Sequence, residues 1–144
     1  MEDAYKQFDG AFQAFAYWCG YSIARAKDKN LREIAAANEL FNLMSADLRD
    51  SEKIFSEASY TLLMNGSPFH VKSLDKKPLR NDQYLDILIY EKIGKDKAKS
   101  IHCFEIKRFK AGIRAIEADI EKMNGVNVSK KLSRWVIVFG KQDI

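Results

Sequence analysis

The sequence contains few of the residues that mark specialised classes of protein. Its 144 residues include only two cysteines, Cys19 and Cys103, and two prolines, Pro68 and Pro78. This excludes a disulfide-rich scaffold and a proline-rich disordered chain. No apolar run approaches the roughly 20 residues that a membrane-spanning helix needs. The polar start, MEDAYKQFDG, does not resemble a secretory signal.

These absences favour a protein that works inside the cell. Cys19 and Cys103 lie in a predicted helix and a predicted strand and could be bonded in principle, but two buried thiols are more typical of a reducing compartment. We therefore expect a cytoplasmic location and no membrane partner. Residues 1–144 have the length of one domain, and 47% hydrophobic and 31% charged residues suit a globular fold with a core.

The charge is mildly basic and unevenly distributed. The formal net charge is +4 and the pI is about 9.0, which permits a polyanionic partner without requiring one. Residues 67–144 carry seventeen of the twenty-four lysines and arginines. Any surface that binds phosphate is therefore expected on the second half of the chain.

The first half of the chain is predicted to be helical. In residues 2–26, aromatic and other apolar side chains recur at steps of three and four, as on one face of a helix. Further helices are predicted over residues 30–49 and 51–64. The first 50 residues would form a helical extension, and residues 51–139 would form the core of the domain.

The second half is predicted to contain the sheet. A short strand is expected at Phe69 and Val71. Strands over residues 83–91 and 100–109 would form an antiparallel hairpin around a charged turn at 94–99. They are followed by a helix over 112–124, with Ile113, Ile116, Ile120 and Met123 facing inward, and a strand over 134–139. Strand, helix and strand favour a parallel crossover. The expected class is α/β (α+β), with a mixed sheet flanked by helices.

Three charged residues interrupt these apolar strands. Asp86 lies in the first strand of the hairpin, and Glu105 and Lys107 lie in the second. Glu105 and Lys107 are two residues apart and share one face. A turn near residues 95–96 would place Asp86 opposite Glu105. Two such carboxylates repel each other unless a cation lies between them, and hard oxygen ligands suit Mg²⁺ or Mn²⁺.

This arrangement resembles the PD-(D/E)xK nuclease superfamily, which has a restriction-endonuclease-like core. The resemblance is carried by Leu85-Asp86-Ile87, by Glu105-Ile106-Lys107, and by the helix and strand that follow, within residues 51–139. Many members have proline where this chain has Leu85. The resemblance implies an α-β-β-β-α-β core that is preceded here by additional helices.

The resemblance also implies roles for individual residues. Asp86 and Glu105 would bind a divalent metal, the backbone carbonyl of Ile106 would add a ligand, and Lys107 would assist the attacking water. A glutamate on the first core helix commonly completes such a site. The best-spaced candidate is Glu57, followed by Glu52, and then by Glu33 and Glu39 on the preceding helix.

Simpler explanations exist for each of these residues. Glu105 and Lys107 could form an ordinary salt bridge, Asp86 could bond to a loop, and Glu57 could lie on a solvated helix face. His102 is expected to be structural, the role of His70 is open, and no zinc site is expected.

Two further groups of side chains have alternative interpretations. A basic cluster could contact phosphates or could merely begin a solvated helix; it comprises Lys107, Arg108, Lys110 and Arg114. Aromatic residues in 2–26 could stack on bases, but core packing or a dimer interface is more typical of this spacing. These residues include Phe8, Phe12, Phe15, Tyr17, Trp18 and Tyr21.

Two functional hypotheses follow. The leading one is a metal-dependent nuclease that hydrolyses phosphodiester bonds of DNA or RNA, either as an endonuclease or as an exonuclease. Asp86 and Glu105 would hold Mg²⁺ or Mn²⁺, with Glu57 adding a ligand, and Lys107 would orient the water. The alternative is a catalytically silent α/β module that binds a protein or nucleic-acid partner. Its working surface would be the aromatic N-terminal helix, through which a homodimer is also plausible.

Overall fold

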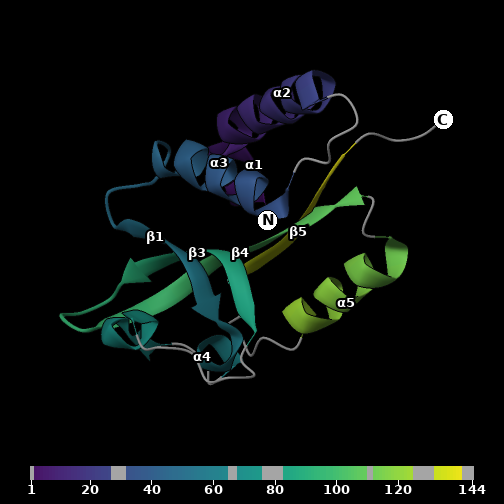
Figure 1. Cartoon of the computed structure of the whole chain (residues 1–144). Coiled ribbons are helices and arrows are strands. Elements are labelled where there is room, and N and C mark those ends of the chain that lie inside the picture. Colours follow the sequence, from purple (N-terminus) through teal and green to yellow (C-terminus); the bar gives the residue numbers. More distant parts are fainter. Residues whose placement is uncertain are drawn as a thin grey trace.

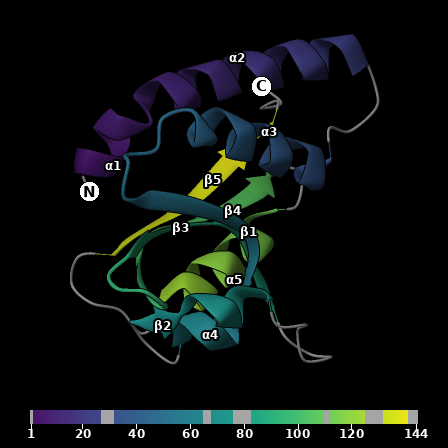
Figure 2. The same cartoon turned by 90° about the vertical axis from the view of Figure 1, so that its left-hand side faces the viewer.

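A five-stranded mixed sheet separates two layers of helices in the computed structural model (Figure 1). The structure describes residues 2–26, 32–64, 68–75, 83–109, 112–124 and 132–140. The strands are β1 (Glu52–Ser59), β2 (Phe69–His70), β3 (Tyr84–Lys92), β4 (Lys97–Arg108) and β5 (Ser133–Phe139). One face is covered by α1 (Glu2–Gln7), α2 (Asp9–Ala26) and α3 (Glu33–Ser45). The other face carries α4 (Tyr60–Met64) and α5 (Ile113–Asn124), as Figure 2 shows. A 3₁₀ turn, η1 (Val71–Asp75), follows β2.

The long strand β4 organises the sheet. It pairs antiparallel with β3, which in turn pairs antiparallel with β1. On its other side β4 pairs antiparallel with β2 near its start and parallel with β5 along its second half. The helix α5 connects β4 to β5, as a parallel pair requires. The predicted mixed sheet with flanking helices is therefore confirmed.

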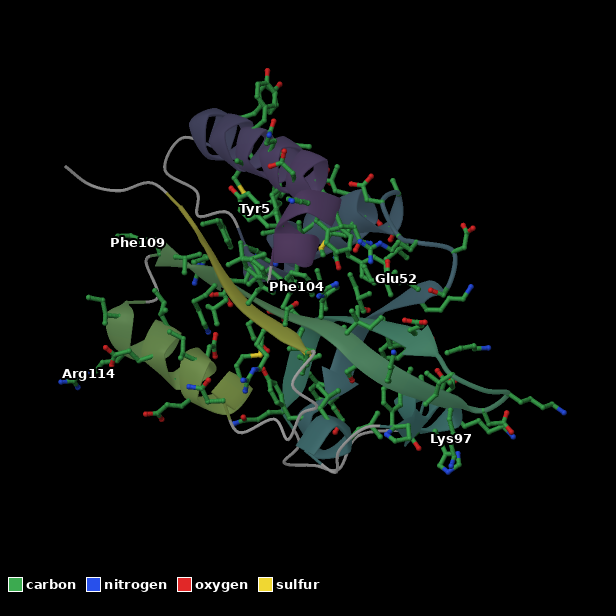
Figure 3. All side chains as sticks on the ribbon, turned by 180° about the vertical axis from the view of Figure 1, so that it is seen from behind. Tyr5, Glu52, Lys97, Phe104, Phe109 and Arg114 are labelled. Atoms are coloured by element: carbon green, nitrogen blue, oxygen red, sulfur yellow. The ribbon has the colours of Figure 1, made fainter. Side chains whose placement is uncertain are left out.

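The first core lies between the sheet and the N-terminal helices. Phe8 is fully buried and its ring meets the rings of His102 and Phe104 edge to face. Phe104 points into this layer, near the start of the chain in Figure 3. From α3, Leu40 and Met44 pack into the same cluster. The aromatic stripe of the first helix is thus largely core, as its helical spacing favoured.

The second core lies between the sheet and the short helices α4 and α5. Leu88 and Cys103 are fully buried there, together with Met123 of α5. Cys19 and Cys103 are both free and buried, so they do not form a disulfide. Burial raises the pKa of the Cys19 thiol to about 11 and that of Cys103 to about 12. Both thiols therefore stay protonated near neutral pH.

Most predicted elements are confirmed, with shifted ends. The first predicted helix is divided at Phe8 into α1 and α2, and the second is α3. The short strand ends at His70, because Val71 already belongs to η1. The hairpin strands, α5 and β5 lie where the pattern predicted them, although β4 begins inside the predicted turn, at Lys97. No helix among the described residues combines the length and the apolar character needed to cross a membrane.

The prediction of a helix over residues 51–64 is wrong for its first two-thirds. Residues 52–59 form β1, and only Tyr60–Met64 is helical. Ile54 and Ala58 fit a helical repeat, but Ile54 and Phe55 also have strong strand propensity. Pairing along β3, from Glu52 opposite Glu91 onward, satisfies backbone groups that a helix would leave exposed on the edge of β3. Sheet formation therefore overrides the local pattern.

The inward face predicted for α5 is only partly correct, because Met123 is buried and Ile116 is half-buried, but the other two isoleucines are exposed. Ile113 is 71% exposed and Ile120 is 43% exposed, whereas Asp119 and Met123 are the buried residues of this helix. The helix is therefore rotated so that a carboxylate, rather than the isoleucine row, faces the sheet. The ion pairs described below supply the compensation that burial of Asp119 requires.

One residue of β1 has an unusual backbone. Glu57 has a φ of 62°, in the left-handed region that costs a non-glycine residue about 1–2 kcal/mol. We predict that Glu57→Gly is more stable than Glu57→Ala by about 1 kcal/mol, because only glycine adopts this φ without strain. Urea unfolding of the two variants checks this difference. Equal stability, or a more stable alanine variant, would contradict the observed backbone.

Candidate functional site

Two carboxyl groups lie side by side on the α5 face of the sheet. The β3–β4 register pairs Ile87 with Phe104, and the adjacent Asp86 and Glu105 continue it. Asp86 Oδ2 accepts the Ile106 amide at 2.8 Å, and its carboxyl group is close enough to that of Glu105 for a hydrogen bond between them to act on its pKa. Burial raises the pKa of Asp86, although these two hydrogen bonds oppose that effect. A hydrogen bond between two carboxyl groups requires a proton on one of them.

Glu105 is the more deeply buried member of this pair. It is only 5% exposed, and burial, followed by the charge of Asp86, raises its pKa from 4.5 to about 8. The buried Tyr60 hydroxyl donates to Glu105 Oε1 at 2.8 Å. Burial and the charge of Glu105 in turn raise the pKa of Tyr60, so Tyr60 remains a hydrogen-bond donor. The site therefore combines a carboxyl group whose raised pKa favours its protonated form with a fixed hydrogen-bond donor.

A buried aspartate on α5 lies between two lysines. Asp119 is 3% exposed, with Oδ2 lying 3.1 Å from Lys107 Nζ and Oδ1 lying 3.1 Å from Lys122 Nζ. Burial alone would lower the pKa of Lys107, but the hydrogen bond and charge of Asp119 raise it. Lys122 Nζ also lies 5.4 Å from the centre of the Tyr60 ring. Asp119 thus joins Lys107 and Lys122 beside the carboxyl pair.

Glu33 approaches the same region from the first residue of α3. Its Oε1 accepts the Arg108 amide at 3.1 Å and lies 3.9 Å from Arg108 Nε. The charge of Glu33 contributes to raising the pKa of Asp86, after the effect of burial, and it also acts on Lys107. Glu33, like Asp119, is therefore an acidic group within electrostatic range of Asp86.

A groove opens on the outer side of these residues. It has a volume of about 650 Å³ and lies along α5, next to the start of α4. Its lining consists of Tyr60, Gln83, Lys107, Ala115, Ala118, Asp119, Glu121 and Lys122. Tyr60, whose hydroxyl donates to Glu105, therefore borders the same open space as Lys107 and Lys122. A ligand in this groove would lie against both lysines.

The structure brings together the three residues predicted to form the catalytic centre. Asp86 and Glu105 are adjacent, and Lys107 lies on the same face, where its ion pair is with Asp119 rather than with Glu105. The backbone of Ile106 takes part through its amide, while its side chain packs into the first core. Glu105 and Lys107 therefore have separate partners instead of a mutual salt bridge: Glu105 accepts a hydrogen bond from Tyr60, and Lys107 pairs with Asp119.

Two of the glutamates predicted as further metal ligands lie at different positions along β1. Glu57 was predicted on a helix but lies in β1, exposed, with its backbone opposite Asp86; its role as a metal ligand stays a prediction. Glu52 is buried at the opposite end of β1, where it accepts hydrogen bonds from the Arg49 amide and the Gln7 side chain. It serves the packing of α1 against β1 (Figure 3).

The remaining predicted groups separate into core and surface. His102 is buried and hydrogen-bonded to Ser133, which agrees with a structural role. His70 is exposed in β2. Of the basic cluster, Arg108 pairs with Glu33, and Arg114 projects outward at the start of α5 in Figure 3. Lys110 lies outside the described residues.

Among the described residues, no three histidine, cysteine, aspartate or glutamate side chains form a ready-made metal-binding cluster. The candidate ligands are instead two carboxyl groups that are already in contact. Mg²⁺ is commonly held by only one or two carboxylates, with waters and substrate phosphates as the other ligands. A pair of this kind therefore suffices for a hard divalent cation.

Sequence patterns missed Tyr60, Asp119 and Lys122. Tyr60 lies in the part of the predicted helix 51–64 that is helical, but its contact with Glu105 depends on the strand β1 that precedes it. The predicted inward row of α5 did not include Asp119. One available signal was the i, i+3 spacing of Asp119 and Lys122, which indicates an ion pair on one helix face. Its connection to Lys107 required the rotation of α5 against the sheet.

The raised pKa of Glu105 predicts how stability depends on pH. Without divalent metal, the folded protein binds this proton more tightly than the unfolded chain does. Stability from this group is therefore complete below about pH 4.5 and is lost as the pH rises to about 8. Glu105→Gln mimics the protonated acid, so it should flatten this slope and raise the Tm at pH 8 by about 5 °C.

Thermal unfolding in EDTA between pH 5 and pH 9 measures this slope. Glu117→Gln, on the exposed side of α5, is the matched control and should keep the wild-type slope. If Glu105→Gln and Glu117→Gln show the same pH dependence, Glu105 does not carry the shared proton.

Comparisons with known proteins do not provide a function for this chain. No protein-family model matches it, and neither the curated proteins nor the solved structures include a match. The function is therefore argued from the chemistry of the site.

Proposed function

We propose that this protein is a metal-dependent nuclease that hydrolyses phosphodiester bonds of DNA or RNA. The observation that carries the proposal is the buried contact between Asp86 and Glu105 beside two lysines. Burying two carboxyl groups together is costly, and here a proton offsets the repulsion. The free-energy cost of burying both carboxyl groups is understandable if the pair serves a function.

The residues present fit a divalent cation such as Mg²⁺ or Mn²⁺. Asp86 and Glu105 supply hard oxygen donors, and Tyr60 keeps the Glu105 carboxyl group oriented. Glu33, or Glu57 across β3, would add a further carboxylate. The backbone carbonyl of Ile106 remains a predicted ligand. When bound, the cation would polarise a phosphate oxygen and lower the pKa of a bound water.

The protein's own residues would orient the reactants. Lys107 would place the attacking water or stabilise the charge that develops on the phosphate, because its raised pKa keeps it cationic at neutral pH. Asp119 holds Lys107 in place from the opposite side. Tyr60 would keep donating to Glu105 while the carboxylate is ionised.

The order of elements also supports the proposal. From α3 onward, the helix, the antiparallel strands β1, β3 and β4, the helix α5 and the parallel strand β5 follow an α-β-β-β-α-β order, with α4, β2 and η1 inserted between β1 and β3. This is the order that the PD-(D/E)xK resemblance implies. The first core helix would then be α3 instead of residues 51–64, which makes Glu33 the glutamate to consider first.

A metal-binding measurement tests the site directly. We predict that Mn²⁺ raises the Tm of the wild type by several degrees, since a cation that binds only the folded state stabilises it by mass action. Asp86→Asn should abolish the shift, whereas Asp75→Asn, an exposed aspartate of η1, should retain it. A full Mn²⁺ shift in Asp86→Asn would contradict the assigned ligands.

A cleavage assay tests the activity. Wild-type protein with Mn²⁺ or Mg²⁺ should cleave single-stranded DNA, duplex DNA or RNA, and EDTA should stop the reaction. We predict that Lys107→Ala lowers kcat at least a hundredfold while the Mn²⁺-dependent Tm shift persists. Equal rates for the wild type and Lys107→Ala would mean that the activity comes from elsewhere.

A partner-binding module is the second candidate. Tyr17 is 80% exposed and Tyr21 is 56% exposed on α2. An apolar groove of about 450 Å³ lies between this helix and β5. A homodimer or another partner on this side stays a prediction, and sedimentation equilibrium of wild type and Tyr17→Ser would test it.

A further inference from the structure

The groove beside the carboxyl pair contains one lysine that the proposed reaction does not use. Lys122 is held by Asp119 Oδ1 at 3.1 Å and lies over the Tyr60 ring. These two contacts fix its ammonium group at the groove, although its side chain is still 30% exposed. A cation that is fixed but still reachable is suited to bind an anion.

We propose that Lys122 binds a phosphate group of a nucleic-acid strand in this groove, adjacent to the phosphodiester that is cleaved. This inference rests on the proposed function, because it places the strand relative to Asp86, Glu105 and Lys107. It assigns a substrate-binding site to α5, separate from the carboxyl pair.

The charge distribution within the groove favours an anionic ligand at its inner end. Asp119 neutralises only one of the two ammonium groups that it contacts, so these three residues keep one positive charge. The carboxylate of Glu121 balances that charge over the groove as a whole. Asp119 Oδ2 is buried, and Lys107 Nζ lies 3.1 Å from it. Asp119 therefore keeps both ammonium groups beside the groove, where an anion can contact them.

The shape of the groove supports the same conclusion. Two of the α5 residues that line it are Ala115 and Ala118, whose small side chains leave room in front of the lysines. Gln83 adds an exposed amide that can donate to a phosphate oxygen. Glu121 is the opposing feature, since its exposed carboxylate lies at the rim and would repel an anion.

Lys122 and Glu121 therefore form a test pair of neighbours with opposite expected effects. Binding of a fluorescent single-stranded oligonucleotide would be measured by anisotropy in EDTA, so that no cleavage occurs. Lys122→Gln should weaken binding about 3–10-fold and reduce the slope of log K against log salt by about one. Glu121→Gln should tighten binding about 2–3-fold, because it removes a repelling charge.

The control is a lysine in a similar ion pair away from the groove. Lys99 lies 4.0 Å from Glu91 on the hairpin and is 46% exposed. Lys99→Gln should leave both the affinity and the salt slope close to those of the wild type. Each variant is first shown to be fully folded at the assay temperature, so that a loss of binding cannot be a loss of folding.

The kinetic readout separates this proposal from the proposed function. Lys122→Gln should raise KM with kcat nearly unchanged, whereas Lys107→Ala lowers kcat. If Lys122→Gln binds and cleaves like Lys99→Gln, the phosphate site is overturned while the nuclease stands. If the wild type binds but never cleaves with any metal, the nuclease fails and the binding series alone decides the site.

Free phosphate is the alternative ligand for the same lysines. Inorganic phosphate at matched concentration should compete only weakly with the oligonucleotide, because a strand adds contacts outside the groove. If phosphate stabilises the wild type and no oligonucleotide binds, the site takes a free anion and the proposal is wrong.

Discussion

The contact between the carboxyl groups of Asp86 and Glu105 determines how the surrounding residues must be arranged. Two acids cannot be placed together in the middle of a sheet without a proton or a cation to offset their repulsion. In this structure the Tyr60 hydroxyl and the Ile106 amide donate to the pair, and the raised pKa of Glu105 favours its protonated form near neutral pH. Two hydrophobic side chains at positions 86 and 105 would pack equally well against the neighbouring apolar residues of β3 and β4. Packing alone therefore does not explain why two acids occupy these positions.

The same constraint accounts for the orientation of α5. A helix with exposed isoleucines and a buried aspartate is unusual for a surface helix. It becomes understandable because Asp119 must reach Lys107, whose side chain leaves the sheet beside Glu105. Lys122 then completes the charge around Asp119. In this orientation Ile113 and Ile120 are exposed, while Asp119 forms a charged cluster with Lys107 and Lys122 next to the carboxyl pair.

The sequence predicted those parts of the structure that depend on neighbours along the chain. Apolar runs interrupted by Asp86 and Glu105 were sufficient to locate the hairpin and to place these two residues opposite each other. They did not predict the one-residue register shift between Ile89 and Tyr90. The sequence could not predict β1, because Ile54 and Ala58 fit a helix and a strand equally and the edge of β3 decided between them. It also missed the link between Asp119 and Lys107, which arises only when α5 packs against the sheet.

The central claim is that the proton shared by Asp86 and Glu105 occupies the place of a divalent cation. Calorimetric titration with Mn²⁺ at pH 7, repeated in buffers of different ionisation enthalpy, measures the protons released on binding. Because the pKa of Glu105 is about 8, the account predicts close to one proton released per Mn²⁺ at pH 7 and almost none at pH 9.5. Mn²⁺ binding without proton release at pH 7, or no Mn²⁺ binding at either pH, would contradict it.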